Sequence, residues 1–205
     1  RIHIRNTYSQ WKTLKGGVPQ GSLSGPECFL HMLSDLKTKV KGVKYVDDTT
    51  LVEIIHRSET SQMQEATNET QEWSKTNMLG INATKTKELV INFGKNVIDP
   101  EPLVIAGEQI EHVHSTKLLA VIISDNLKWD NHVDYICSKA AKRLYYLRQL
   151  KRSGLSTSEL TETYLTLVRP IMEYVAPVWG TGLSKESTKH AESIQKRACK
   201  IILPG

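Results

Sequence analysis

Two adjacent aspartates, Asp47 and Asp48, lie in the stretch KYVDDTTLVEI between two apolar runs that are typical of β-strands. Two carboxylates this close repel each other unless water or a cation separates them. The pair is therefore either the solvated tip of a hairpin, where Asp suits the turn geometry, or a site for Mg²⁺, which prefers one or two carboxylates plus substrate phosphates. Two such ions stabilise the attacking and leaving oxygens of a phosphoryl transfer.

Three further motifs accompany the aspartates in order along the chain. GVPQGSLSGP at 17–26 is a Gly/Pro/Ser loop, NATKTKELVINF at 82–93 leads into a strand-like run, and KLLAVI follows at 117–122. Taken alone, the first is a turn in which Ser22 or Ser24 caps the next helix. Lys85 in the second is, taken alone, an ordinary surface lysine. At this point each motif could equally be a purely structural feature or part of a functional site.

Together, this ordered series resembles the reverse transcriptase domain of non-LTR (LINE-type, jockey-like) retrotransposons. Those domains have a GVPQGS loop before a helix, a Y/F-x-D-D hairpin, N-x-x-K-T before a strand, a K-Y-L-G-V strand and helical C-terminal segments. The resemblance covers essentially the whole chain, including WDNHVDYICSKAAKRLYYLRQL, YLTLVRPIMEYVAPVW and IQKRACKII near its end.

The resemblance implies roles for the matching positions. Asp47 and Asp48 would be catalytic metal ligands, and Tyr45 would pack near the 3′ end of a primer. Gln20 and Gly21 would border the incoming nucleotide and the template, since Gly permits close backbone approach and Gln offers both a donor and an acceptor.

The resemblance also implies the reaction and its participants. Lys85 would lie near the leaving pyrophosphate as a cation or proton donor. The cofactor would be Mg²⁺ in a two-metal site, with Mn²⁺ as a possible substitute. The substrates would be an RNA template, a DNA primer and a dNTP, and the place of action would be inside the cell, at the nuclear integration target.

The chain departs from the family pattern in three places. Ser24, Glu27 and His31 stand where apolar residues are usual. The family's first metal-binding Asp precedes the GVPQGS loop, whereas residues 1–26 contain no Asp or Glu and the chain begins with Arg1. We therefore expect a C-terminal fragment without the fingers, which does not extend a primer on its own. Ala120 also stands where the family favours Gly. A catalytically dead remnant that binds nucleic acid at most, or another acidic-pair phosphotransferase, remains an alternative.

Hydrophobic periodicity predicts the elements that must position these residues. The first part reads as mixed strands and helices, and the part after residue 125 reads as helices alone. We expect an α+β fold, with a polymerase palm (an antiparallel sheet with packed helices) over 1–125 and an all-helical thumb-like region over 126–205. The expected elements are a hairpin in 1–15, helices over 27–39 and 58–75, strands over 42–46, 49–55, 87–93 and 117–124, a hairpin over 103–110, and helices over 129–150, 160–175 and 186–203. Pro170 predicts a kink in the helix 160–175.

Charge and composition narrow the class of partner. The net charge is +5, and residues 128–152 alone contain seven Lys/Arg against two Asp. This predicts phosphate-backbone contacts by Lys139, Lys142, Arg143 and Arg148, although a solvated helix face has the same composition. Three widely spaced cysteines favour a reduced, intracellular setting, and the longest apolar run, LLAVII, is too short to span a bilayer.

Four aromatic residues lie within the same basic region. Trp129, Tyr135, Tyr145 and Tyr146 form a stripe that either stacks on bases or packs as core and amphipathic surface. The sequence leaves both interpretations open.

Overall fold

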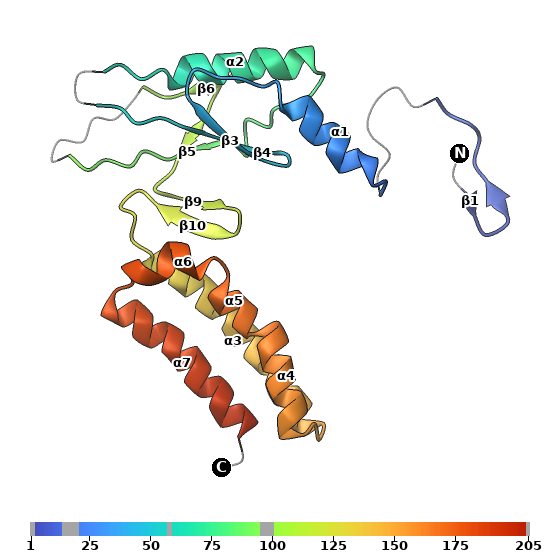
Figure 1. The fold of residues 1–205 in the computed structure, drawn as a ribbon, viewed down its shortest axis with the longest axis vertical. Coiled ribbons are helices and arrows are strands. Elements are labelled where there is room, and N and C mark those ends of the chain that lie inside the picture. The colour runs from blue at the N-terminus through green and yellow to red at the C-terminus, as the bar shows by residue number, and fades with distance from the viewer. Residues whose placement is uncertain (1–2, 14–20, 57–58, 95–100, 204–205) are drawn as a thin grey trace. The chain divides into compact units, whose positions relative to one another are not determined.

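The structure is a computed structural model that describes residues 3–13, 21–56, 59–94 and 101–203 (Figure 1). The chain divides into two compact units. The first comprises Arg1–Ala83 and Leu103–Gln109, and the second comprises Thr84–Pro102 and Ile110–Gly205. Both contain helices and short strands, which confirms the mixed α+β class.

Within its described residues, the first unit is built from three hairpins and two helices. β1 (His3–Ile4) pairs with β2 (Thr7–Tyr8), β3 (Lys41–Tyr45) with β4 (Asp48–Val52), and β6 (Val104–Ile105) with β7 (Glu108–Gln109), all antiparallel. The hairpin predicted around Ala106 and Gly107 is confirmed, and both residues have positive φ (54° and 84°), as a type I′ turn requires. The helices are α1 (Ser24–Leu33) and α2 (Met63–Thr76).

Both helices begin at a different residue from the one predicted. Helix α1 starts at Ser24 rather than Glu27, because the Oγ of Ser22 accepts a hydrogen bond from the backbone N–H of Gly25 at 3.1 Å. Helix α2 starts at Met63, and the predicted cap, Ser58, lies outside the described residues.

Helix α2 holds the first unit together. Ala66 of α2 is fully buried, and the segment that ends α1 and leads to β3 contributes the buried side chains of Leu33, Leu36 and Val40. The indole N–H of Trp73 donates to Asp35 at 2.8 Å. The side-chain amide of Gln64 both donates to and accepts from the backbone of Val104 at 2.9 Å, which fixes β6 on the helix.

The strands of the second unit differ from the predicted ones. β5 (Lys87–Glu88) pairs in parallel with β8 (Glu111–His112), so the predicted strand 87–93 is a strand only at its start. The predicted strand 117–124 is wrong: β9 (Ser115–Leu118) and β10 (Val121–Ser124) form an antiparallel hairpin. The chain reverses because Leu119 and Ala120 both have positive φ. Among the described residues, every sheet consists of only two strands, so the continuous multi-stranded sheet of a palm is not seen.

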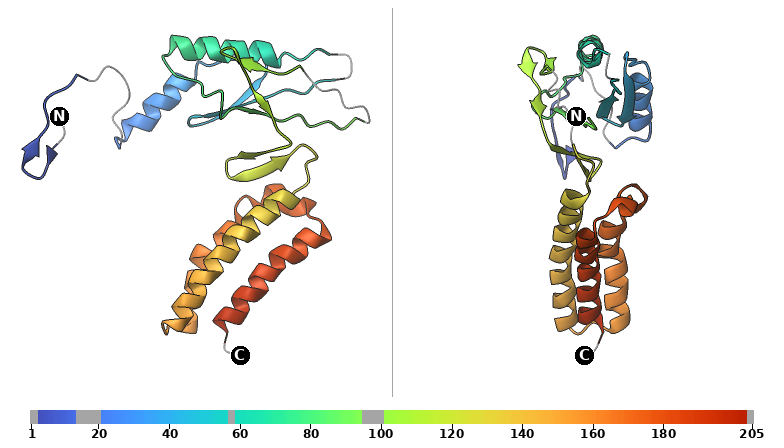
Figure 2. Two further views of the ribbon diagram at one scale, coloured as in Figure 1. Left: turned by 180° about the vertical axis from the view of Figure 1, so that it is seen from behind. Right: turned by 90° about the vertical axis from the view of Figure 1, so that its left-hand side faces the viewer.

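The described part of the second unit after β10 is helical (Figure 2). They are α3 (Asp130–Arg152), α4 (Thr157–Leu167), α5 (Arg169–Glu173), α6 (Ala176–Trp179), the 3₁₀ turn η1 (Gly180–Gly182) and α7 (Lys185–Ile202). The predicted first and third helices are confirmed as α3 and α7. The predicted helix 160–175 is divided at Val168. Pro170 has no N–H to donate, and its ring clashes with the backbone carbonyl one helical turn before it.

The core of the second unit lies between α3, α4, α5 and α7. Leu144 and Leu147 of α3, Leu160 of α4 and Ile194 of α7 are at most 2% exposed. Helices α3 and α7 run in the same direction, because Asp130 meets Ser187 near their first turns and the ammonium of Lys151 donates to Leu203 O at their ends. No helix within the described part of the chain is long and apolar enough to cross a membrane.

Candidate functional site

The β3–β4 hairpin brings three predicted site residues together. Tyr45 and Asp48 are directly opposite partners in the strand register, and Val46 and Asp47 form the two-residue turn between them. Directly opposed side chains in an antiparallel pair have Cβ atoms about 5 Å apart. Tyr45, Asp47 and Asp48 are all exposed. The hairpin therefore presents a tyrosine ring and two carboxylates at one solvent-facing tip.

The backbone at this tip is strained. Val46 has φ 53°, a conformation that a β-branched residue rarely adopts. The first residue of a two-residue hairpin turn with positive φ is normally Gly. Strain of this kind costs roughly 1–3 kcal/mol and is concentrated at functional sites. The turn beside Asp47 is thus held in a strained conformation.

Lys44 anchors the hairpin, and sequence reasoning missed it. Its ammonium donates to the carbonyl oxygens of Leu33 and Leu36, each at 2.6 Å. Leu33 is the last residue of α1, where a lysine commonly binds the terminal carbonyls, and Leu36 lies in the segment that leads to β3. Because Lys44 adjoins Tyr45, this contact fixes the hairpin to the end of α1. A lysine within an otherwise apolar strand was the available signal in the sequence.

The loop before α1 is described only in part. Gly21 has φ 84°, and a Cβ added there would meet nothing within 4 Å. Its glycine is therefore required by backbone conformation and not by space. Gln20 lies outside the described residues, so its place beside a nucleotide stays a prediction.

Lys85 belongs to the second unit, whereas Asp47 and Asp48 belong to the first. Lys85 is exposed in the turn that precedes β5. Its proximity to the aspartates stays a prediction.

The donor set at the hairpin suits a hard cation. Over the described ranges, no group of three His, Cys, Asp or Glu residues converges in a way that could hold a metal ion. At the hairpin, the carboxylates available to a cation are therefore the two of Asp47 and Asp48. This matches the requirement of Mg²⁺, which takes one or two carboxylates and completes its shell with water and phosphate oxygens. His112 and His114 form no such cluster, and each lies beside one carboxylate, Glu88 and Asp125 respectively.

The four predicted phosphate-contacting residues of α3 do not share one face. All four are exposed, and α-helical residues advance by about 100° each. Lys139, Lys142 and Arg143 therefore fall within about 100° of one another, whereas Arg148, nine residues after Lys139, lies on the opposite side of the helix. The structure brings three of the four together.

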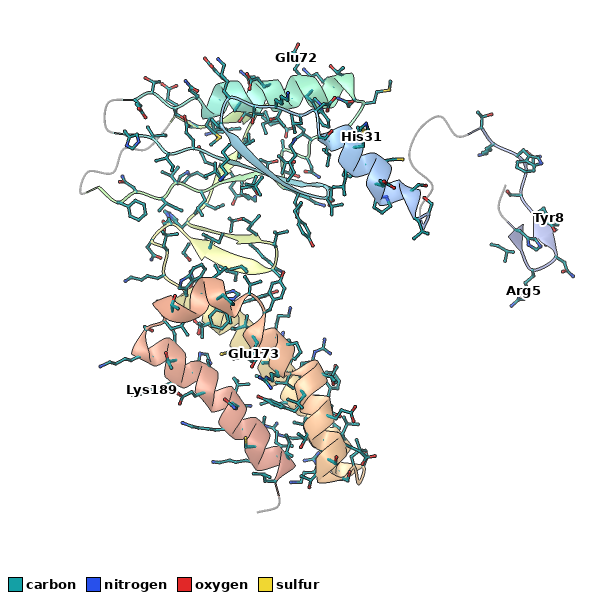
Figure 3. The ribbon with its side chains drawn as sticks, in the orientation of Figure 1. Arg5, Tyr8, His31, Glu72, Glu173 and Lys189 are labelled. Atoms are coloured by element: carbon teal, nitrogen blue, oxygen red, sulfur yellow. The ribbon has the colours of Figure 1, made fainter. Side chains whose placement is uncertain are left out.

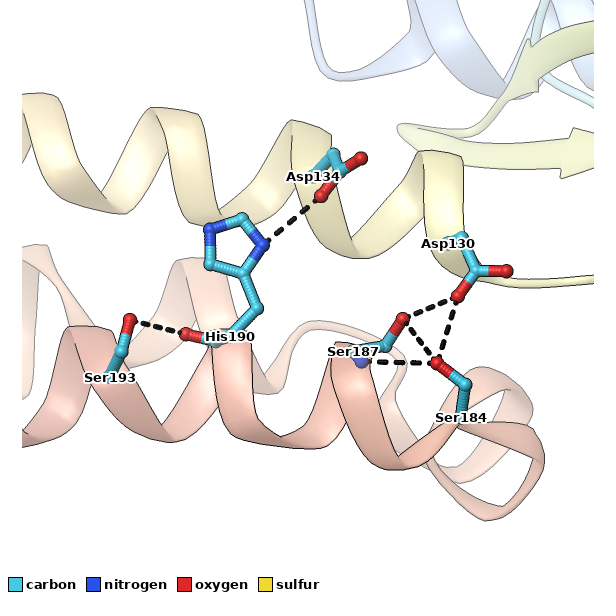
Figure 4. A network of polar contacts seen from close by, with 6 residues as sticks. All are labelled: Asp130, Asp134, Ser184, Ser187, His190 and Ser193. Carbon is cyan, nitrogen blue, oxygen red and sulfur yellow. Dashed lines mark hydrogen bonds and ion pairs between the residues drawn. The ribbon is translucent and has the colours of Figure 1, made fainter.

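The acidic residues of α3 are turned towards α7 (Figure 4). Asp130 accepts hydrogen bonds from the hydroxyl groups of Ser184 and Ser187, and these bonds hold the pKa of Asp130 below its usual value. Asp134 contacts the Nδ1 of His190 at 3.1 Å. The negative charge of α3 is thus used in joining the two helices.

His132 is a second residue that sequence reasoning missed. It is 1% exposed, and its Nδ1 accepts a hydrogen bond from the backbone N–H of Ile122 at 3.2 Å. Its Nε2 has no protein partner, and the rings of Trp129 and Trp179 lie edge-on to it. Burial lowers the pKa of His132, so the ring is neutral and carries its proton on Nε2. It joins β10 to α3.

Comparison with known proteins gives consistent similarities. The sequence model of the family described as "Reverse transcriptase (RNA-dependent DNA polymerase)" matches residues 2–136. The chain is 25% identical over 219 residues to "Probable RNA-directed DNA polymerase from transposon BS" of Drosophila melanogaster, covering 98% of this chain and 24% of that protein. It is 27% identical over 211 residues to "RNA-directed DNA polymerase from mobile element jockey" of Drosophila funebris, covering 92% and 22%.

A third relative is "Retrovirus-related Pol polyprotein from type-1 retrotransposable element R1" of Bradysia coprophila, which is 25% identical over 179 residues, covering 82% of this chain and 18% of that protein. The chain therefore spans a quarter or less of the length of these curated relatives. No solved structure matches it.

Proposed function

Because the chain belongs to the reverse transcriptase family, we propose that it is a part of an RNA-directed DNA polymerase of a retrotransposon. The reaction is nucleotidyl transfer, in which the 3′-OH of a DNA primer attacks the α-phosphate of a dNTP opposite an RNA template. A bond from the primer oxygen to the α-phosphorus forms, and the bond to pyrophosphate breaks. The DNA to be extended implies a nuclear place of action.

The β3–β4 hairpin is the observation that carries this proposal. Its exposed tip presents Tyr45, Asp47 and Asp48 within the segment that the family model matches. Asp47 and Asp48 would hold Mg²⁺, or Mn²⁺ in its place, through their carboxylates. The bound ion would neutralise charge that develops on the phosphate oxygens.

The remaining residues bind and orient the substrates in this proposal. The ring of Tyr45 packs against the terminal nucleotide of the primer, and Gln20 and Gly21 border the incoming nucleotide and the template. Lys85 offers positive charge, or a proton, to the departing pyrophosphate.

The palm and thumb assignment is part of the same proposal. Residues 1–125 form a partial palm and residues 126–205 a thumb-like region. The proposal is supported by the change in secondary structure after β10. This strand ends at Ser124, and the elements from there to Ile202 are all helices. The cations of α3 then contact the phosphate backbone of the primer–template duplex.

The proposed metal site can be tested with Mn²⁺ as a paramagnetic probe of the 205-residue chain. We expect Mn²⁺ to broaden the amide NMR signals of the β3–β4 hairpin selectively, and Asp47→Asn and Asp48→Asn each to reduce this effect. Glu72→Gln is the matched control, since Glu72 is an exposed carboxylate of the same unit that points outward from α2 (Figure 3). Broadening that is unchanged in both Asp variants would contradict the proposed site.

The proposal has one competitor, a catalytically inactive remnant that only binds nucleic acid. One observation favours that competitor: Leu119 and Ala120 occupy a turn whose backbone conformation favours glycine. The reading frame upstream of Arg1 separates the two, since an intact Asp-bearing segment there supports a working polymerase and stop codons support the remnant. With two carboxylates at the hairpin, we expect the chain alone to incorporate no dNTP on a primed RNA template, and measurable incorporation would contradict this expectation.

A further inference from the structure

Two tyrosines of α3 are left exposed by the packing of the second unit. Tyr145 is 55% exposed and Tyr146 is 53% exposed. Trp129, at the other end of the same aromatic stripe, is instead half-buried, and a Cβ added to Gly182 would lie only 3.0 Å from its ring. The structure thus divides the stripe into a core part and a surface part.

Cations are interleaved with these two tyrosines and with Tyr135, which is half-buried and packs against the core. We call this surface the α3 outer face, and we define it by the side chains that share this side of the helix, together with Lys117 of β9 beside it. Its residues are Lys117, Tyr135, Lys139, Lys142, Arg143, Tyr145 and Tyr146.

Contacts between rings and cations show how closely the groups of the α3 outer face are arranged. The ammonium groups of Lys117 and Lys139 lie 5.0 Å and 5.2 Å from the centre of the Tyr135 ring. The guanidinium of Arg143 lies 5.9 Å from the centre of the Tyr146 ring. The ring of Tyr145 meets that of Tyr146 edge-on, with centres 5.9 Å apart.

The charge on this face is of one sign. Residues 135–152 of α3 contain no Asp or Glu, and the two aspartates at the start of the helix, Asp130 and Asp134, contact α7. None of the lysines or the arginine of the α3 outer face forms an ion pair within the described part of the chain. A polyanion is therefore the occupant with complementary charge.

The tyrosines indicate which kind of polyanion fits. In a duplex the bases are stacked on one another and are not available to an external ring. In a single strand each base has an exposed face that stacks on an aromatic side chain, while nearby cations contact the phosphates. Exposed rings alternating with cations therefore suit a single strand better than a duplex, which needs the cations alone.

We propose that the α3 outer face binds single-stranded nucleic acid, with unpaired bases stacking on Tyr145 and Tyr146 and phosphates contacting Lys142 and Arg143. The inference rests on the proposed function only in taking nucleic acid as the partner. It adds a site for unpaired nucleotides to the duplex contacts proposed above.

The test is fluorescence anisotropy of the 205-residue chain with a labelled oligouridylate of about 12 nucleotides. We expect the double variant Tyr145→Ala/Tyr146→Ala to weaken binding by about tenfold or more, because each stacked base contributes substantially to affinity. Tyr145→Phe/Tyr146→Phe keeps both rings and should bind within about twofold of the wild type. Leu165→Ala is the matched control, since it removes another exposed apolar side chain from a helix of the same unit.

Two further probes make the result specific. A blunt RNA–DNA duplex should bind the wild type and the double Ala variant equally, and vesicles rich in phosphatidylserine should not compete with the oligouridylate. The inference would be overturned by unchanged oligouridylate binding in the double Ala variant, by an equal loss of duplex binding, or by efficient competition from vesicles. Because Mn²⁺ binding at the hairpin is measured separately, failure here leaves the proposed nucleotidyl-transfer function standing.

Discussion

His132 illustrates how a single buried side chain sets the response of the second unit to acid. Its Nδ1 must be unprotonated to accept the hydrogen bond from Ile122, and burial lowers the pKa of His132 from the ordinary value of 6.5. Below pH 6.5 the unfolded chain therefore takes up the proton more readily than the folded one. The stability that depends on neutral His132 is fully present above pH 6.5 and is lost as the pH falls towards its lowered pKa.

We predict that the free energy of unfolding of the second unit falls by about 1 kcal/mol or more on acidification below pH 6.5, since protonation leaves the N–H of Ile122 without its acceptor. His132→Gln should have lower stability at neutral pH and a smaller loss in acid. Urea unfolding followed by fluorescence measures both, with His31→Gln, an exposed histidine of α1, as control. An acid response that is identical in His132→Gln and the wild type would contradict this role.

At the scale of elements, the β9–β10 hairpin turns through two residues that disfavour its conformation. Leu119 has φ 44° and Ala120 has φ 68°. The turn is nevertheless held in place, because the hydroxyl of Tyr174 donates to Leu119 O at 3.2 Å and His132 accepts from Ile122. Tertiary contacts thus maintain a turn that its local sequence does not favour.

Ala120→Gly should therefore stabilise the second unit by about 1 kcal/mol, because glycine adopts positive φ without steric cost. Thermal unfolding followed by circular dichroism would show a higher midpoint temperature. Ala141→Gly, within α3, makes the same chemical change where φ is helical and should be destabilising by about 1 kcal/mol. A decrease in stability for both variants would show that the turn is not strained.

The start of α7 gives a second prediction for an element. The Oγ of Ser184 accepts from the backbone N–H of Ser187 at 3.0 Å and donates to Asp130. Ser184→Ala removes both the helix cap and the link to α3, so we expect a loss of about 1 kcal/mol or more in chemical denaturation. Ser193→Ala, whose hydroxyl donates only within α7 to His190 O (Figure 4), should stay within about 0.5 kcal/mol of the wild type. Equal losses in the two variants would contradict a capping role.

The elements that sequence predicted well carry their own local signals. β3 and β4 follow from apolar runs around a tight turn, and α3 and α7 follow from helical periodicity. The segment 117–124 was mistaken for one strand because an apolar run without Gly, Pro or Asn gives no sign of a turn. Likewise, the tip with Tyr45, Asp47 and Asp48 was predictable from its hairpin, whereas the roles of Lys44 and His132 arise from contacts with other elements.

At the scale of the whole molecule, the excess positive charge should govern association with nucleic acid. The affinity for an RNA–DNA duplex should fall steeply with salt, because each phosphate contact releases counterions. Changing Lys139, Lys142 and Arg143 together to Gln should reduce the slope of log K against log salt by about 2–3, whereas Arg148→Gln alone should reduce it by less than about 1.

The matched control for this prediction lies on α7. Lys185, Lys189 and Lys196 are exposed, and Lys189 points away from the helices (Figure 3). Changing all three to Gln removes the same charge from another helix. A salt slope that falls equally in the two triple variants would show that the net charge matters and the position of the α3 cations does not.

The parallel arrangement of α3 and α7 has a consequence for the order of folding. The paired positions Asp130 and Ser187 are 57 residues apart, and Lys151 and Leu203 are 52 apart. Contacts of this separation form late, because a long loop must close before they contribute. During synthesis, α3 therefore leaves the ribosome with part of the apolar face of Leu144 and Leu147 uncovered until α7 has followed it. For that interval the nascent chain exposes apolar surface, which favours aggregation.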